Sequence, residues 1–271
     1  MDILHAIFLG LIQGLTEFLP ISSSGHLALL EHYFDVQEAG LAFDVLLHVG
    51  TLVALISFFW QDWWDMGRAL LRPERFNRLE RRLFWYLVAG SVPGALAGFF
   101  LEKQAETVFR TPSRIAVLLA VLGVLLYLAD RLGRHQRRLP GITLSDAILI
   151  GCAQALAIMP GVSRSGSTIT MGLFLGFSRE TAARFSFLLS TPIIFGAGFY
   201  YFLKLLKNGG GLSFNLAYFL GFLAAVISSY LTIKYLLQFL QRHTFLIFVV
   251  YRLLVAAVVL ALEFYYPVVP H

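Results

Sequence analysis

Polar side chains capable of acid–base or nucleophilic chemistry gather near the start of the chain, in the segment QGLTEFLPISSSGH. Gln13 and Glu17 are four residues apart, so a helix would place both side chains on one face. The proline and serine run that follows interrupts a helix and frees backbone N–H groups that can bind an anion, while His26 can donate a proton or act as a nucleophile. Glu17 has a second interpretation: its carboxylate is paired merely to stabilise packing, or it lies at the outer surface of a membrane. The candidate site residues of this segment are Gln13, Glu17, Ser22, Ser23, Ser24 and His26.

A second segment, PGVSRSGST, supplies the opposite charge. Arg164 lies between Ser163 and Ser165, and Thr168 follows within one helical turn. Arginine matches the geometry of phosphate oxygens, and hydroxyl groups with the N–H groups of a helix N-terminus complete such a site. The alternatives for Arg164 are a guanidinium that extends to the membrane surface or a buried pair with Glu17. An arginine cradle that faces a Glu/His/Ser cluster indicates phosphoryl transfer, which requires charge neutralisation and a positioned nucleophile.

These two segments are copies of one element at an offset of 141 residues. The stretch GLIQGLTEFLPISSSG from Gly10 aligns with GCAQALAIMPGVSRSG from Gly151, and FDVLL from Phe43 matches FSFLL from Phe185 at nearly the same offset. We therefore expect one domain built of two halves, about 1–138 and 139–271. Duplicated halves with broken helices are typical of membrane proteins that place a site near the bilayer midplane.

The composition predicts an all-α polytopic membrane protein. Hydrophobic residues make up 58% of the chain and charged residues 14%, with a mean hydropathy of +0.74, which excludes an ordinary soluble domain. Each repeat segment resembles a re-entrant helical hairpin, with second arms expected at Leu27–Phe34 and Thr168–Phe177. Six apolar runs are close to the ~20 residues that cross a bilayer: Phe43–Trp60, Leu83–Leu101, Arg114–Ala129, Phe185–Leu206, Leu212–Leu240 and Thr244–Tyr266.

The arginines predict which loops face the cytoplasm. None occurs before Arg68, but six lie between Arg68 and Arg82 and four between Arg131 and Arg138. The acidic stretch around Asp35, Glu38 and Asp44 and a loop near 103–112 then lie outside, and the two hairpins enter from opposite sides. The net charge of +5 is accounted for by anionic lipid head groups, and we expect no nucleic-acid partner.

Three further polar residues have two interpretations each. His48 and Thr51 either face the central cavity or make a polar packing contact between helices. Arg252, which lies inside the last apolar run, either extends to the surface or pairs with a backbone carbonyl.

The Q-x-x-x-E pattern of Gln13 and Glu17, its continuation FLPISSSGH and the segment PGVSRSGST closely resemble the undecaprenyl-diphosphate phosphatases of the bacitracin-resistance type. The resemblance covers essentially the whole chain, including the YR pair at Tyr251. It implies hydrolysis of undecaprenyl diphosphate to the monophosphate carrier and inorganic phosphate, on the outer side of the bacterial cytoplasmic membrane, for cell-wall synthesis. Many family members have Glu where this chain has Gln13. The matching positions are Gln13, Glu17, Ser23, His26, Ser163, Arg164 and Thr168.

The resemblance also implies a mechanism with open alternatives. Arg164, Ser163 and Thr168 would hold the diphosphate, while Ser23 or His26 attacks the terminal phosphorus and Glu17 orients or deprotonates its partner. Direct attack by water with His26 as general base is the rival. A divalent cation, Mg²⁺ or Ca²⁺, is implied, shared between Glu17 and the diphosphate. A transporter or flippase of a prenyl-phosphate lipid is the competing functional class, and assembly as a homodimer stays open.

Overall fold

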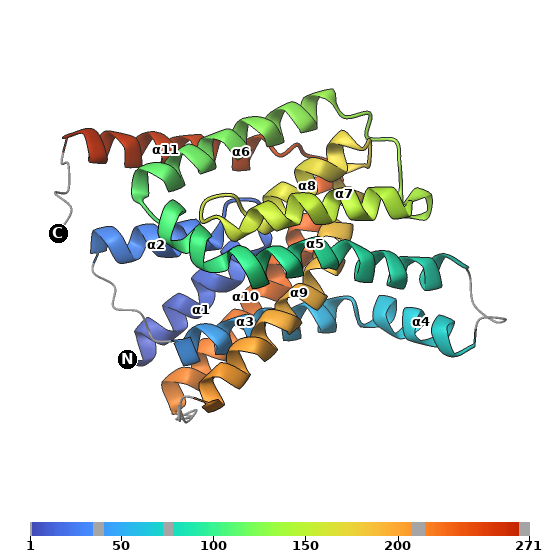
Figure 1. The fold of residues 1–271 in the computed structure, drawn as a ribbon, viewed down its shortest axis with the longest axis horizontal. Coiled ribbons are helices and arrows are strands. Elements are labelled where there is room, and N and C mark those ends of the chain that lie inside the picture. Colours follow the sequence, from blue (N-terminus) through green and yellow to red (C-terminus); the bar gives the residue numbers. More distant parts are fainter. Residues whose placement is uncertain (1, 35–40, 73–77, 208–214, 266–271) are drawn as a thin grey trace.

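The computed structural model describes residues 2–34, 41–72, 78–207 and 215–265, and within these ranges it is helical with no β-strand. The helices follow the apolar runs of the sequence (Figure 1). Their bounds are α1 Ile3–Phe18, α2 Ser23–Phe34, α3 Leu41–Phe58, α4 Trp60–Leu71, α5 Arg78–Phe109, α6 Pro112–Leu132, η1 Leu139–Gly141, α7 Leu144–Ala155, η2 Leu156–Ile158, α8 Arg164–Phe174, α9 Arg179–Lys207, α10 Leu216–Leu240 and α11 Leu246–Tyr265.

Five helices, α5, α6, α9, α10 and α11, are long and apolar enough to cross a membrane. The pair α3 and α4 gives a sixth span if it is counted as one, although it is bent by 71° at its break. The all-α polytopic architecture is therefore confirmed. The expected loop near 103–112 is wrong, because α5 continues as a helix to Phe109 and α6 begins at Pro112. Asp35, Glu38, Leu212 and Tyr266, which entered the predicted topology, lie outside the described residues.

The two predicted hairpins are present, α1 with α2 and α7 with α8, and they open towards opposite ends of the molecule (Figure 1). Their second helices begin earlier than expected, at Ser23 rather than Leu27 and at Arg164 rather than Thr168. Helix α8 also ends earlier, at Phe174. The early starts have a physical reason, since a serine directly before each helix caps its first N–H groups.

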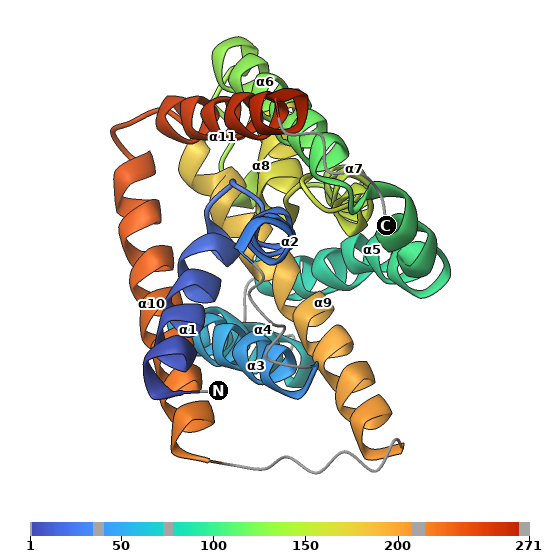
Figure 2. The ribbon, with the colours of Figure 1, turned by 90° about the vertical axis from the view of Figure 1, so that its left-hand side faces the viewer.

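Each hairpin packs on a span from the other half of the chain. Helix α1 lies along α10, as Figure 2 shows, and α7 lies along α5. Glycines bring the backbones together at equivalent places: a Cβ on Gly10 would lie 2.2 Å from the carbonyl oxygen of Gly221, and one on Gly151 would lie 2.1 Å from that of Gly90. Small residues at such crossings allow close packing in a membrane. The two halves are thus interlocked by their hairpins.

Two arginines tie together the elements around the start of the second hairpin. Arg137 Nη2 lies 2.5 Å from Asp146 Oδ2 at the start of α7, and Arg179 Nε lies 2.5 Å from Asp130 Oδ1. Burial raises the pKa of Asp146, but hydrogen bonds from Arg137 and Thr143 outweigh it and leave the pKa below its ordinary value. These arginines are structural.

Candidate active site

The two helix breaks repeat each other in backbone conformation. Ser22 and Ser163 occupy equivalent positions and have φ values of 74° and 71°, a left-handed conformation that is rare outside glycine. Ser22 Oγ accepts a hydrogen bond from the N–H of Gly25 at 3.3 Å, and Ser163 Oγ accepts one from the N–H of Gly166 at 3.1 Å. Each serine therefore caps the second helix of its hairpin.

Arg252 lies behind both breaks and joins them. Its side chain is fully buried, and it donates hydrogen bonds to the carbonyl oxygens of Pro20 at 3.0 Å and Gly161 at 2.9 Å, and to those of Val162 and Leu119. Carbonyl groups freed by a helix break at membrane depth require such donors. The interpretation of Arg252 as a carbonyl partner is confirmed, and its extension to the surface is wrong.

The tips of the hairpins touch. A Cβ on Gly25 would lie 3.1 Å from both N and Cα of Gly161, so these glycines allow the tips to approach. Ser165 Oγ also donates to the carbonyl oxygen of Leu19 at 2.9 Å, from the second tip to the first. The contact places the side chains of both tips around one point.

That point is the carboxylate of Glu17, whose side chain is 3% exposed. Ser23 Oγ donates to Glu17 Oε2 at 3.0 Å, and Gln13 Nε2 donates to the same oxygen at 3.2 Å. Arg164 Nη2 pairs with the other oxygen, Oε1. Ser23 and Arg164 are equivalent in the repeat, each being the first residue of its hairpin's second helix. The pairing of Arg164 with Glu17, one of the sequence alternatives, is what the structure contains.

His26 lies beside this cluster, held in one tautomer. Its Nδ1 lies 2.7 Å from the carbonyl oxygen of Ser22, which can only accept, so Nδ1 carries the proton. Its Nε2 lies 2.7 Å from the hydroxyl of Tyr251 on α11, and the rings stack at 5.5 Å. In the neutral ring Nε2 then has a lone pair, which accepts a hydrogen bond from the Tyr251 hydroxyl. His26 in this state can serve as a base or nucleophile, but not as a proton donor from Nε2.

The other predicted residues take structural positions around the tips. The Oγ atoms of Ser22 and Ser24 in the first tip are 3.5 Å apart. Those of Ser163 and Ser165 in the second tip are 3.3 Å apart. Thr168 is buried one turn into α8, and its hydroxyl lies 2.6 Å from that of Ser186 on α9. The structure therefore brings Gln13, Glu17, Ser23 and Arg164 into direct contact, and Thr168 turns towards α9.

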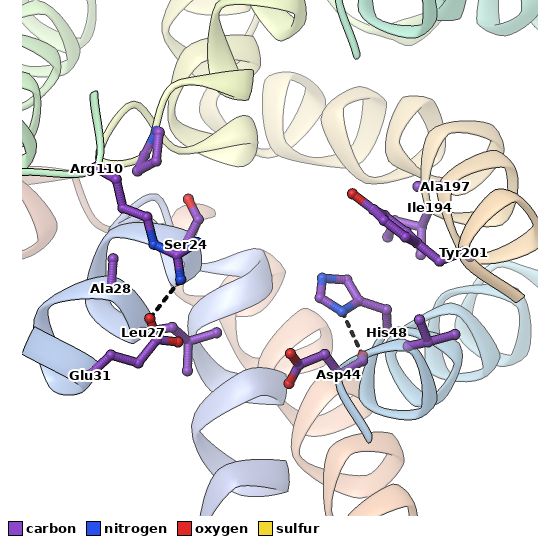
Figure 3. Close-up of a pocket in the computed structure, with 13 residues that line it drawn as sticks. Ser24, Leu27, Ala28, Glu31, Asp44, His48, Arg110, Ile194, Ala197 and Tyr201 are labelled. Atoms are coloured by element: carbon purple, nitrogen blue, oxygen red, sulfur yellow. Dashed lines mark hydrogen bonds and ion pairs between the residues drawn. The ribbon is translucent and has the colours of Figure 1, made fainter. Parts of the chain in front are cut away.

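A cavity of about 430 Å³ adjoins the tips (Figure 3). Ser24 and Pro160 line it from the two tips, and His48 and Asp44 line it from α3. Across the cavity, Arg110 forms an ion pair with Glu31 at 2.7 Å. The rest of the lining comes from α2, α3 and α9 and is apolar except for Tyr201: Leu27, Ala28, Val45, Ile194, Ala197, Gly198 and Tyr201. The cavity therefore combines an apolar wall with charged groups of both signs, Glu31 and Asp44 with Arg110.

The donor set at the tips suits a hard cation only in part. Glu17 and Ser23 offer oxygen ligands, which Mg²⁺ and Ca²⁺ prefer, whereas Gln13 turns its amide nitrogen towards the Glu17 carboxylate. No group of three or more His, Cys, Asp or Glu side chains lies together among the described residues. A cation therefore fits here only where a ligand's own oxygens complete its coordination, as Mg²⁺ sites on phosphates allow.

Sequence reasoning gave too little weight to two residues. Tyr251 entered only as part of a matching pattern, and His48 was balanced between two interpretations. His48 faces the cavity, whereas Thr51 donates within its own helix to the carbonyl oxygen of His48 at 2.8 Å. The available signal was the i, i+4 and i, i+3 spacing of Asp44, His48 and Thr51 in an apolar run.

Comparison with known proteins covers both hairpins. A family model described as bacitracin resistance protein BacA matches residues 6–258. A protein named undecaprenyl-diphosphatase from Moorella thermoacetica is 50% identical over 261 residues, which cover 96% of this chain and 98% of that protein. Proteins of the same name from Pelotomaculum thermopropionicum and Geobacter sulfurreducens are each 49% identical, covering 97% of this chain and 97% and 99% of their own lengths.

Proposed function

The chain belongs to the family of the bacitracin resistance protein BacA, and we propose that its two hairpin tips form the site at which it hydrolyses undecaprenyl diphosphate to undecaprenyl phosphate and inorganic phosphate. It is a multi-pass protein of the bacterial inner membrane. The observation that carries the proposal is the meeting of Ser23 and Arg164 on the Glu17 carboxylate. Two segments far apart in the sequence thereby hold together a proposed nucleophile, Ser23, its base, Glu17, and a guanidinium that can bind phosphate, that of Arg164.

Arg164 binds the diphosphate in this proposal. A phosphate oxygen is a second anion to which the guanidinium can donate. Of the three guanidinium nitrogens of Arg164, only Nη2 has a partner among the described residues, so the other N–H groups can bind the diphosphate. Moving the guanidinium from Glu17 Oε1 to the diphosphate leaves the carboxylate able to accept a proton. Ser163 and Ser165, at the N-terminus of α8, line the anion's position.

Ser23 is the proposed nucleophile. Its Oγ attacks the terminal phosphorus, the bond from that phosphorus to the bridging oxygen breaks, and undecaprenyl phosphate leaves with that oxygen. Glu17 takes the hydroxyl proton, a transfer supported by the 3.0 Å hydrogen bond between them. A water oxygen then bonds to the phosphorus as the bond from phosphorus to Ser23 Oγ breaks. Inorganic phosphate leaves with both water protons, and the Ser23 oxygen takes its proton back from Glu17.

A direct attack by water, with His26 Nε2 as base, is the rival route. It requires Tyr251 to release the Nε2 lone pair that its hydroxyl now occupies. Trapping a phosphoserine at Ser23 after rapid acid quench supports the covalent route. A single turnover that releases inorganic phosphate with no trapped phosphoenzyme would favour attack by water with His26 as base.

A divalent cation, Mg²⁺ or Ca²⁺, completes the proposal. Glu17, with Gln13 beside it, would hold it together with the diphosphate oxygens, and when bound it would neutralise charge on the transferring phosphoryl group.

We place this site on the outer side of the membrane. The cavity lies at the end of the molecule opposite the arginine-rich segments, which favours a periplasmic opening under the positive-inside rule. The anionic head then enters through the cavity, and the prenyl tail lies along the apolar wall and the adjoining lipid-facing helices.

The test is inorganic phosphate release from a short-chain prenyl diphosphate by detergent-purified protein with Mg²⁺ or Ca²⁺. We expect Arg164→Ala and Glu17→Ala each to lower kcat by about 10²–10³-fold, since each removes charge stabilisation or the base. Arg134→Ala, an exposed arginine at the other end, is the matched control and should leave the rate unchanged. Folded wild-type protein that releases no phosphate would contradict the proposal.

A further inference from the structure

Gln13 connects Glu17 to a histidine outside the tips. Its Nε2 lies 3.2 Å from Glu17 Oε2 on one side and 3.4 Å from His48 Nε2, on α3, on the other. A carboxylate accepts but does not donate, so the amide nitrogen of Gln13, and not its oxygen, must face Glu17. The same NH₂ group therefore has its second hydrogen available for His48.

His48 has the tautomer that accepts this hydrogen. Its Nδ1 lies 2.8 Å from the carbonyl oxygen of Asp44, which can only accept, so Nδ1 carries the proton. Nε2 is then a lone pair facing the Gln13 amide. In this series of contacts, His48 Nδ1 donates to the Asp44 carbonyl oxygen. The Gln13 amide nitrogen donates one hydrogen to His48 Nε2 and the other to the Glu17 carboxylate.

His48 lines the cavity, and a contact within its own helix fixes its orientation. Its ring projects into the cavity, beside Asp44 on its own helix and across from Tyr201 on α9 (Figure 3). The hydrogen bond to the Asp44 carbonyl holds the ring against rotation. Gln13, by contrast, is 2% exposed and has a long side chain whose amide needs a partner on each side to stay in place.

We propose that His48 is a positioning residue of the phosphatase site, which acts through Gln13 to hold the Glu17 carboxylate in the orientation that accepts the Ser23 hydroxyl. The inference rests on the proposed role of Glu17 as base. His48 itself touches neither Glu17 nor Ser23 by a hydrogen bond in the described part of the chain. The contribution that His48 makes through Gln13 therefore lies in the rate of the chemical step.

Two substitutions test the acceptor at position 48. In His48→Gln the amide oxygen takes the place of Nε2 and still accepts from Gln13, so we expect kcat within about 3-fold of wild type. In His48→Leu the acceptor is lost, and kcat should fall by about 5–20-fold with KM changed by less than about 2-fold. His243→Leu, at the far end of α10, is the matched control and should leave both constants unchanged.

A double-mutant cycle with Gln13→Met separates this role from a merely structural one. If His48 acts through Gln13, His48→Leu should lower kcat by less than about 2-fold in the Gln13→Met background. Equal losses in both backgrounds, a loss expressed in KM, or a His48→Gln protein as slow as His48→Leu would each overturn the inference. The proposed function is judged separately, since it fails only if wild-type protein itself releases no phosphate.

Discussion

Gln13 and Gln154 stand at the same place in the two hairpins, yet their surroundings differ. Gln13 lies between Glu17 and His48, and His48 in turn lines the cavity. Gln154 is 3% exposed, packs against Gly94 of α5, and neither atom of its amide has a partner among the described residues. The first hairpin has Glu17 where the second has Ile158.

The backbone of the two hairpins is nonetheless the same. Both have a left-handed serine that caps the second helix, both break at a proline, and Arg252 bonds to carbonyls of both. The difference teaches that the duplication supplies the frame and that single residues supply the chemistry. Positions Ser23 and Arg164, equivalent by repeat, meet on one carboxylate because the two frames face each other.

The largest effect should come from breaking both frames together. Arg252→Met leaves the carbonyl oxygens of Pro20, Gly161, Val162 and Leu119 without their buried donor, and we expect a loss of about 3–5 kcal/mol in the free energy of unfolding. Equilibrium unfolding in mixed SDS–detergent micelles measures it. Arg134→Met is the exposed control, and an Arg252→Met protein as stable as that control would show that the two breaks do not depend on this side chain.

The same substitution at the two glutamines separates chemistry from packing. Gln13→Met keeps the side-chain length but removes the donor to Glu17, so kcat should fall by about 10-fold. Gln154→Met removes an amide without a protein partner, so activity should persist and the free energy of unfolding should rise by about 1 kcal/mol. Phosphate release and unfolding in mixed micelles, measured for both variants, test this difference between the two glutamines. Equal losses of activity would contradict it.

The two capping serines should respond alike. Ser22→Ala and Ser163→Ala each remove a cap and should each cost about 1 kcal/mol in the free energy of unfolding. Glycine at either position should recover most of this loss, since it adopts the left-handed conformation without strain and costs little as a cap. A clear difference between the two sites in the same unfolding assay would show that the backbone equivalence does not extend to energetics.

The smallest effect should be a pH dependence that arises from the ion pair at the start of the second hairpin. Because the pKa of Asp146 is lowered in the folded chain, its contribution to stability is complete above about pH 5 and is lost as the pH falls below about 4. Asp146→Asn should lower the free energy of unfolding at neutral pH, where the charged pair with Arg137 is complete, and flatten the stability curve in this window. An unaltered acid limb in the unfolding midpoint would exclude the pair with Arg137 as its source.

Much of this arrangement could be read from the chain alone. Apolar run lengths predicted the spans, and the repeated Pro, Ser and Gly pattern predicted both hairpins, because a bilayer leaves few alternatives to a helix and broken helices need turn-forming residues. The resemblance of the two motifs to those of a phosphatase family identified Glu17, Ser23, His26 and Arg164 as candidate site residues. The sequence prediction placed the start of each second helix four residues too late. Serine rarely adopts a left-handed backbone conformation, so the residue type did not indicate that Ser22 and Ser163 would cap these helices.

Only the tertiary structure decided which side chains meet. Arg164 and Glu17 are 147 residues apart, Arg252 and Pro20 are 232 apart, and Gln13 and His48 are 35 apart. Local sequence sets helix and break through short-range sterics and hydropathy, but these pairings depend on how the interlocked halves pack. The sequence by itself therefore determined the elements and the kind of chemistry, and the packing of the two hairpin tips determined the site, because buried polar groups take their partners from whatever the fold brings within reach.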